Sequence, residues 1–524
     1  MIRSHYLLVA SLLAASLLVG CSSNNDDENM QDNGGGTPPP PAPVRGTLTQ
    51  SPPTRLASLS TADLLGKLAG SDAVKEIVTL VGDPSCTVDV HSLQYNTVGG
   101  ASEATVASAA LMVPSGSSAE CQGSRPILLY AHGTSTDRAY NIADLNNSEN
   151  AEGLLIAATF AAHGYIVVAP NYAGYDTSTL PYHPYLNADQ SSKDMIDALA
   201  AARSALPTSF VPGTTASDKL FITGYSQGGH VAMATHAAMQ AAGSAVTASA
   251  PLSGPYALAA FGDALFYGQV NDNAPVVVTM TIVSYQHAYG NIYASTTDVF
   301  EAKYATGVDT LLPSTLPRST LYDQGKLPRQ QLFSSTPPSD TFAAYTPPTT
   351  PAAFASLFAR GFGTDNLVTN AYRLAYLNDA QANPDGGFPT TTSGIPAAAP
   401  ATGFRKALRA NDLRNWTPTS PLLLCAGNAD PTVFYLNTQL LQGYWASTGA
   451  NPPVTILDID SSKTDGDPYA DLKTGFATFK DLIAAAAVAA GASDGGAQAV
   501  ADAYHATLVA PFCLAAARSK FDSL

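Results

Sequence analysis

The chain has 524 residues, of which 45% are hydrophobic and 13% charged, and its formal net charge is −16. This composition is typical of a large globular core and argues against a disordered or coiled-coil chain. The acidic balance, with no cluster of lysine and arginine, argues against nucleic acid as a partner, because phosphate binding requires such a cluster.

The N-terminus has the pattern of an export signal. Arg3 precedes an apolar run, residues 6–19, which is too short to span a bilayer and resembles the hydrophobic region of a signal peptide. The run ends in Leu18-Val19-Gly20-Cys21, which resembles the lipobox of bacterial lipoproteins. That resemblance implies removal of residues 1–20 and acylation of Cys21, which would anchor the chain to a membrane. Ser22, by the same resemblance, favours the outer membrane of a Gram-negative bacterium; the alternative is an ordinary cleaved signal peptide.

Residues 21–50 are rich in Asn, Asp, Gly and Pro and predict a flexible tether, so we expect the folded part to begin near Ser51. The first two apolar runs after it, 88–95 and 105–113, alternate around Gly99-Gly100 and predict an antiparallel pair of strands.

Strand and helix patterns then alternate along the chain. Short apolar runs typical of buried strands, at 127–131, 166–169 and 220–223, alternate with helical stretches at 153–162, 191–206 and 227–242. This order predicts an α/β fold class with a doubly wound, mostly parallel sheet.

The alternation breaks over residues 256–416, which are rich in Tyr, Phe, Thr and Pro. Strand patterns return at 422–425 and 454–459. We therefore expect one core built from residues 51–255 and 417–524, with residues 256–416 inserted between late strands as a cap.

The sequence Gly224-Tyr225-Ser226-Gln227-Gly228 matches the motif G-x-S-x-G. It follows the buried-strand run 220–223 and opens a helical stretch, which is the strand, turn, helix context that a nucleophile elbow requires. Glycines on both sides allow the close backbone approach of a strained turn. This context identifies Ser226 as the candidate nucleophile.

The run 127–131 ends in His132-Gly133-Thr134, which resembles the His-Gly pair of esterases and lipases. By that resemblance, the backbone N–H groups of Thr134 and Gln227 would bind the developing oxyanion. Gly133 is an alternative donor to Thr134, and His132 itself is expected to be structural.

The acid and base should follow the serine in the order Asp, His. Asp430 ends a Gly-containing turn after the buried-strand run 422–425, and His505 is the only histidine beyond it, so we expect these two to complete a triad. Of the other histidines, His230, one helical turn after Ser226, is the one expected to line the pocket. Rival acids that we expect to face solvent are Asp458, Asp460, Asp465 and Asp467.

Together these motifs resemble the α/β-hydrolase superfamily, and within it the secreted bacterial and fungal lipases and carboxylesterases with a large cap, over about 125–253 and 421–518. The resemblance implies a serine hydrolase that cleaves a small-molecule or lipid ester through an acyl-enzyme, with no metal or organic cofactor. Two alternatives stay open: a serine exopeptidase on the same fold, and a catalytically silent surface-binding lipoprotein. The oligomeric state is not predicted.

With Cys21 assigned to lipid, four cysteines remain, an even number that in an exported protein predicts disulfides with three possible pairings. We favour Cys86 with Cys121, which flank the expected hairpin, and Cys425 with Cys513, which flank the acid and base candidates. Metal binding is disfavoured because no two cysteines have a short ligand spacing.

Overall fold

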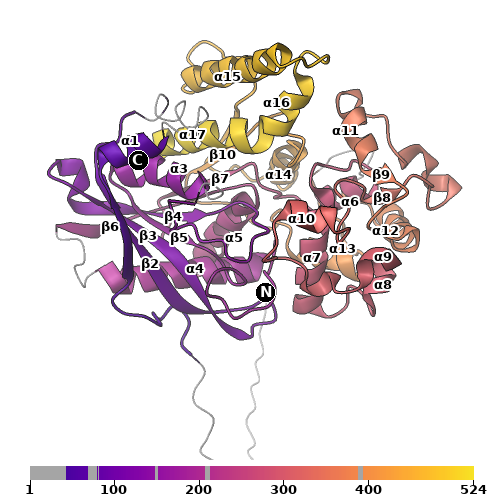
Figure 1. Ribbon diagram of the computed structural model, residues 1–524, viewed down its shortest axis with the longest axis horizontal. Helices are drawn as coiled ribbons and strands as arrows, with labels where there is room; N and C mark the ends of the chain where they lie inside the picture. The colour runs from indigo at the N-terminus through magenta and orange to yellow at the C-terminus, as the bar shows by residue number, and fades with distance from the viewer. Residues whose placement is uncertain (1–42, 69–79, 81, 148–150, 207–212, 387–393) are drawn as a thin grey trace, which may run out of the picture. The chain divides into compact units, whose positions relative to one another are not determined.

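A nine-stranded sheet forms the centre of the computed structural model, which describes residues 43–524 except 69–79, 81, 148–150, 207–212 and 387–393 (Figure 1). The strand order is β1-β2-β3-β5-β4-β6-β7-β10-β11. The strands are β1 (Thr54–Leu59), β2 (Thr87–Val98), β3 (Ala104–Ser115), β4 (Gly123–Ala131), β5 (Ile166–Pro170), β6 (Thr214–Tyr225), β7 (Ala248–Leu252), β10 (Leu422–Ala426) and β11 (Val454–Asp458). The first four in spatial order pair antiparallel, and those from β5 to β11 pair parallel, so the predicted fold class is confirmed.

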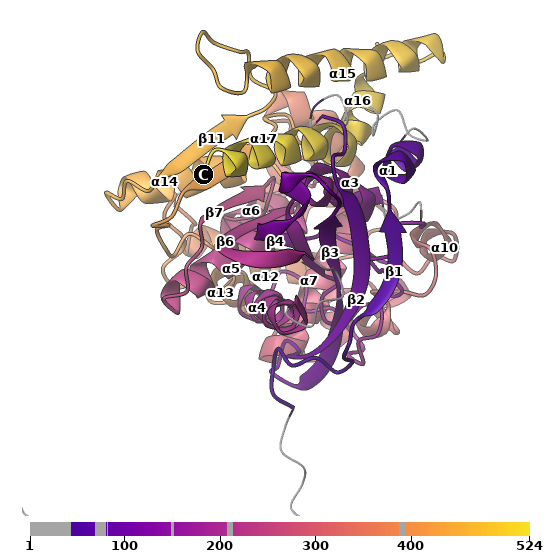
Figure 2. The ribbon, with the colours of Figure 1, turned by 90° about the vertical axis from the view of Figure 1, so that its left-hand side faces the viewer.

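Helices cover both faces of the sheet. Helices α4 (Ala188–Ala205) and α5 (Gln227–Ala241) lie on one face, and α3 (Ala151–Thr159) and α17 (Ala510–Asp522) lie on the other (Figure 2). Every residue of β5, β7 and β10 is buried, which explains why these strands are continuously apolar rather than alternating. Helix α14 (Leu436–Ser447) packs Leu441 and Trp445 against Met233 of α5.

The inserted region, residues 256–416, lies between β7 and β10. It contains α6 (Leu258–Phe266), α7 (Ala274–Tyr289), α8 (Thr296–Val299), α9 (Ala302–Ala305), α10 (Arg318–Asp323), α11 (Ala355–Arg360), α12 (Asn370–Ala382), α13 (Gly403–Ala410) and a pair of short strands, β8 (Phe333–Ser334) and β9 (Phe362–Gly363). Its apolar side chains form a cluster distinct from that of the sheet. The sequence shows no clear strand and helix alternation here, because segments rich in Pro and Thr, such as residues 334–351, separate the helices.

Buried ion pairs accompany the apolar cluster of the inserted region. Arg405 lies between Asp263 and Asp379, with the closest N–O distances at 2.7 and 3.1 Å. Arg414 contacts Asp385 and Asp412, each at 2.8 Å, with all three side chains fully buried.

The chain after β11 is helical: it forms α15 (Ala470–Ala489), α16 (Ala497–Ala503), the π-helix η8 (Tyr504–Val509) and then α17. Near the other end of the chain, the short helix α1 (Thr61–Leu68) follows β1. Among the described residues, the continuous helical stretch Ala497–Asp522 alone is long and apolar enough to cross a membrane. More than half of its most apolar window is buried against the protein, which is typical of a core helix.

The folded part begins before Ser51, which corrects the expected end of the tether. Arg45 forms an ion pair with Asp197 at 2.9 Å, and Leu48 makes a bridge to Tyr95 of β2. The backbone after Arg45 pairs with β2 and gains hydrogen bonds that the composition does not reveal. Residues 1–42, with the predicted signal peptide and Cys21, lie outside the described residues.

Two disulfides join Cys86 to Cys121 and Cys425 to Cys513, the pairing expected from the sequence. The second ties β10 to α17, so it links the strand before Asp430 to the helix after His505.

Candidate active site

Ser226 occupies the sharp turn between β6 and α5. Its φ of 60° and ψ of −121° lie outside the ordinary regions for a residue with a side chain, and its N–H donates to Leu252 O at 3.0 Å. A Cβ on Gly224 would meet Gly228 O at 2.4 Å, and one on Gly228 would meet Ala131 O at 2.0 Å. Both glycines of the motif are therefore required by the close packing of this turn.

Asp430 and His505 form a hydrogen-bonded pair at the end of β10. His505 Nδ1 lies 2.7 Å from Asp430 Oδ2, and the carboxylate is fully buried. Its other oxygen accepts the N–H groups of Thr432 and Val433 at 2.9 and 3.0 Å. Both carboxylate oxygens act as acceptors, Oδ1 for the two backbone N–H groups and Oδ2 for the imidazole. His505 Nδ1 therefore carries the proton, and Nε2 presents its lone pair.

Ser226 and His505 line the same cavity, although no hydrogen bond joins them and His505 Nε2 is buried without a partner. Nucleophile and base contacts are often loose before substrate binds, so this separation is compatible with general-base chemistry. The structure thus brings residues 226, 430 and 505 to one edge of the sheet.

Two tyrosines that the sequence analysis did not single out hold this pair. Tyr225 donates to the backbone oxygen of His505, and their rings lie 4.9 Å apart. Tyr504 donates to Asp460 at 2.7 Å and accepts the N–H of Ala429, next to the acid, at 3.2 Å. The only signal was adjacency, since each tyrosine precedes a candidate site residue.

The rival acids have other partners. Asp460 pairs with Lys480 as well as Tyr504, and Asp458 accepts from Asn428 at 2.8 Å. Neither contacts His505 among the hydrogen bonds of the described residues.

Around the expected oxyanion site, the amide of Gly133 is already used. It donates to both carboxylate oxygens of Glu152, at 3.0 and 3.2 Å, which removes Gly133 as an alternative to Thr134. On the other side, the Gln227 side chain donates to His183 Nε2 at 2.6 Å, while His183 Nδ1 lies 2.9 Å from Ala173 O. Burial lowers the pKa of His183 to about 3, so it stays neutral and can accept that bond.

His132 is structural, as expected, whereas the expectation for His230 is wrong. His132 is buried and stacks on Tyr172 with ring centroids 4.2 Å apart, and burial lowers its pKa to about 4. His230 is fully buried, bonds Asn411 O at 2.9 Å and is not among the residues lining the cavity. Its side of α5 faces the end of the inserted region rather than the turn of Ser226.

Comparison with known proteins supports the fold and a hydrolytic role. The model of the prolyl oligopeptidase family matches residues 154–274, and no curated protein matches the chain. The crystal structure of the rice cell wall degrading esterase LipA from Xanthomonas oryzae is 27% identical with a TM-score of 0.61, covering 83% of this chain and 95% of that one. Its ligand-bound form is 26% identical with a TM-score of 0.64, covering 92% of this chain and all of that one. The chain has the α/β-hydrolase fold.

The cavity that Ser226 and His505 line has a volume of about 790 Å³ and two kinds of wall. Hydroxyl groups come from the loop after β4 and the segment before α10, including Thr134, Thr136 and Thr315. Apolar side chains come from α6 and α7, including Phe261 and Val276. The inserted region thus supplies much of the wall that faces the serine.

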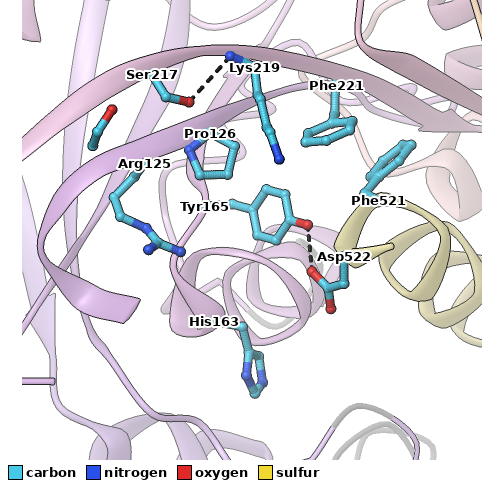
Figure 3. A pocket seen from close by; sticks show the side chains of 10 residues that line it. Arg125, Pro126, His163, Tyr165, Ser217, Lys219, Phe221, Phe521 and Asp522 are labelled. Carbon is cyan, nitrogen blue, oxygen red and sulfur yellow. Dashed lines mark hydrogen bonds between the residues drawn. The ribbon is translucent and has the colours of Figure 1, made fainter. Parts of the chain in front are cut away.

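A second cavity, of about 340 Å³, lies at the opposite end of β4 and β6 (Figure 3). Arg125, Lys219 and Tyr165 line it, and Tyr165 donates to Asp522 at 2.6 Å. It shares no lining residue with the cavity of Ser226 and so is not part of the candidate active site. Among the described residues no group of His, Cys, Asp and Glu side chains could hold a metal ion.

Proposed function

We propose that the protein is a serine esterase that hydrolyses carboxylic esters through an acyl-enzyme. The observation that carries the proposal is the shared cavity of Ser226 and His505, in which the imidazole is held at 2.7 Å by the buried Asp430 carboxylate. The likeness to LipA, an esterase, supports an ester rather than another acyl substrate.

In the proposed mechanism, His505 Nε2 takes the proton of the Ser226 hydroxyl as its oxygen attacks the ester carbonyl. The amides of Thr134 and Gln227 stabilise the oxyanion, and Asp430 stabilises the imidazolium. The imidazolium protonates the departing alkoxide, which leaves as the alcohol. Water, deprotonated by His505, then cleaves the acyl-serine to the acid and restores the enzyme.

The test is Ser226→Ala. We expect its kcat on p-nitrophenyl esters to fall by several orders of magnitude, on the order of 10⁴-fold or more, with the unfolding temperature unchanged. A fluorophosphonate probe should label the parent at Ser226 and leave the variant unlabelled. Parent-level hydrolysis by the variant would refute the proposal, and a parent that resists the probe would favour a silent binding protein.

A second candidate, a serine peptidase, is favoured by one observation, the match of residues 154–274 to the prolyl oligopeptidase family model. That match includes the turn of Ser226, a feature that esterases and peptidases can share. A kcat/KM on peptidyl amides that exceeds the value on acyl esters would select the peptidase.

We also propose that the protein is exported and lipid-anchored through Cys21, on the sequence pattern alone. Cys21→Ser should release the protein from the membrane fraction. Mass spectrometry of the mature N-terminal peptide should find the acyl chains on Cys21 in the parent; an unmodified peptide would refute the anchor.

A further inference from the structure

Glu152 stands at the cavity wall beside the loop that follows β4. It lies in the first turn of α3 and lines the cavity with Gly133 and Thr134. Its carboxylate accepts the Tyr130 hydroxyl at 2.6 Å and the Gly133 N–H at 3.0 Å. Burial raises the pKa of Glu152, and those two hydrogen bonds oppose the rise. Among the described residues no cation pairs with this acid, and burying an unpaired acid is costly, so its position needs an explanation.

The backbone before Thr134 is held at three points. Tyr172 donates to His132 O at 3.0 Å, His132 Nδ1 lies 2.6 Å from Gly133 O, and Glu152 accepts the Gly133 N–H. With these groups engaged, the next backbone donor along the loop is the N–H of Thr134. That N–H lies in the Gly133–Thr134 peptide plane, whose carbonyl oxygen contacts His132 Nδ1. Glu152 fixes the preceding plane, His132–Gly133, through the Gly133 N–H, and so restricts the rotation at Gly133 that would redirect the Thr134 amide.

We propose that Glu152 is a positioning residue that, as a hydrogen-bond acceptor for Gly133, orients the Thr134 amide toward the oxyanion. This inference rests on the proposed esterase function. Glu152 touches no reacting atom; it acts through the loop.

The experiment compares Glu152→Ala and Glu152→Gln with a matched control. Glu103→Ala removes a carboxylate with partners of the same two kinds, a tyrosine hydroxyl (Tyr182, 2.7 Å) and a backbone N–H (Ala101, 2.8 Å). Glu103 lies at the β2–β3 turn and does not line the cavity. Glutamine keeps the acceptor oxygen and loses the charge.

For Glu152→Ala we expect kcat to fall about 100-fold with KM within about threefold, as for loss of one oxyanion donor. Affinity for a boronic acid, which forms a tetrahedral adduct with serine, should fall by a similar factor. Glu152→Gln should stay within about fivefold of the parent, and the control should be unchanged.

Hydrogen exchange supplies a readout that does not depend on activity. The peptide spanning residues 132–140 should exchange faster in Glu152→Ala than in Glu152→Gln. Parent kcat in Glu152→Ala at a lowered unfolding temperature would show a merely structural role and overturn the proposal. A Glu152→Gln variant as slow as Glu152→Ala would overturn it too, because the charge would then be required. If Ser226→Ala hydrolyses esters at the parent rate, the esterase proposal fails. Unchanged hydrogen exchange of the 132–140 peptide in Glu152→Ala would refute the Glu152 proposal alone.

Discussion

The α/β core and the inserted region 256–416 each bury an apolar cluster, but they bury charge differently. Among the described residues, the ion pairs in which both side chains are at most 3% exposed all lie in the inserted region, around Arg405 and Arg414. In the core, the buried carboxylate of Asp430 is met by backbone N–H groups and an imidazole. The buried Asp430 carboxylate of the core thus serves the candidate site, whereas the buried ion pairs of the inserted region hold that region together.

This contrast predicts that replacing Asp430 lowers the rate, whereas replacing a buried arginine of the inserted region lowers the stability. The largest effect should come from Asp430→Asn. An amide cannot stabilise the imidazolium and favours the wrong tautomer, so kcat should fall about 10⁴-fold. Unfolding temperature should change little, since the Asn oxygen can still accept the N–H groups of Thr432 and Val433.

Asp458→Asn is the control for this prediction, because Asp458 belongs to the next strand and contacts Asn428 instead of His505. Ester hydrolysis at saturating substrate measures both. A loss of less than tenfold in Asp430→Asn would mean that His505 is oriented by another group.

Arg414→Met should produce the reverse pattern. The variant leaves the carboxylates of Asp385 and Asp412 buried without a cation, which should lower the free energy of unfolding by about 3–5 kcal/mol. The folded protein should keep kcat within a few-fold, since neither partner lines the cavity.

Urea unfolding measures this loss, with Arg329→Met as the matched control. Arg329 also pairs with an aspartate of the inserted region, Asp323, but both side chains are more than 60% exposed. Exposed pairs contribute at most about 1 kcal/mol, so equal losses in the two variants would contradict the role assigned to burial.

The same contrast separates what the sequence could predict from what it could not. The turn of Ser226 is local, since its glycines, strand and helix are contiguous, and the order of Asp430 and His505 follows from the topology of the sheet. Glu152, Tyr504 and the orientation of His230 depend on packing between segments far apart in the chain. A spacing of four residues from Ser226 could not show that His230 turns toward Asn411.

The two disulfides provide a smaller test within the core. Replacing either pair with alanine should cost about 2–4 kcal/mol of unfolding free energy, because each closes a loop, of 88 residues for Cys425–Cys513 and 35 for Cys86–Cys121. Only loss of Cys425–Cys513 should also lower kcat, since it joins β10 to α17 on either side of Asp430 and His505. Mild reduction should accordingly lower activity before global unfolding, and equal kcat values in the two variants would contradict this.

The smallest effect should come from the wall that the inserted region gives to the cavity. Phe261 of α6 lines the cavity and packs against Phe434, with ring centroids 5.5 Å apart. If the apolar wall receives the acyl chain, Phe261→Ala should lower kcat/KM for long-chain esters by roughly tenfold, the scale of one lost apolar contact, and leave acetyl esters near the parent value. Phe354→Ala removes a ring that also packs on Phe434, at 5.9 Å, but does not line the cavity, so it controls for the packing itself. An equal loss at every acyl length would mean that the acyl chain does not lie against Phe261. Removing a side chain that the acyl chain contacts should weaken only the esters whose acyl chain is long enough to reach it.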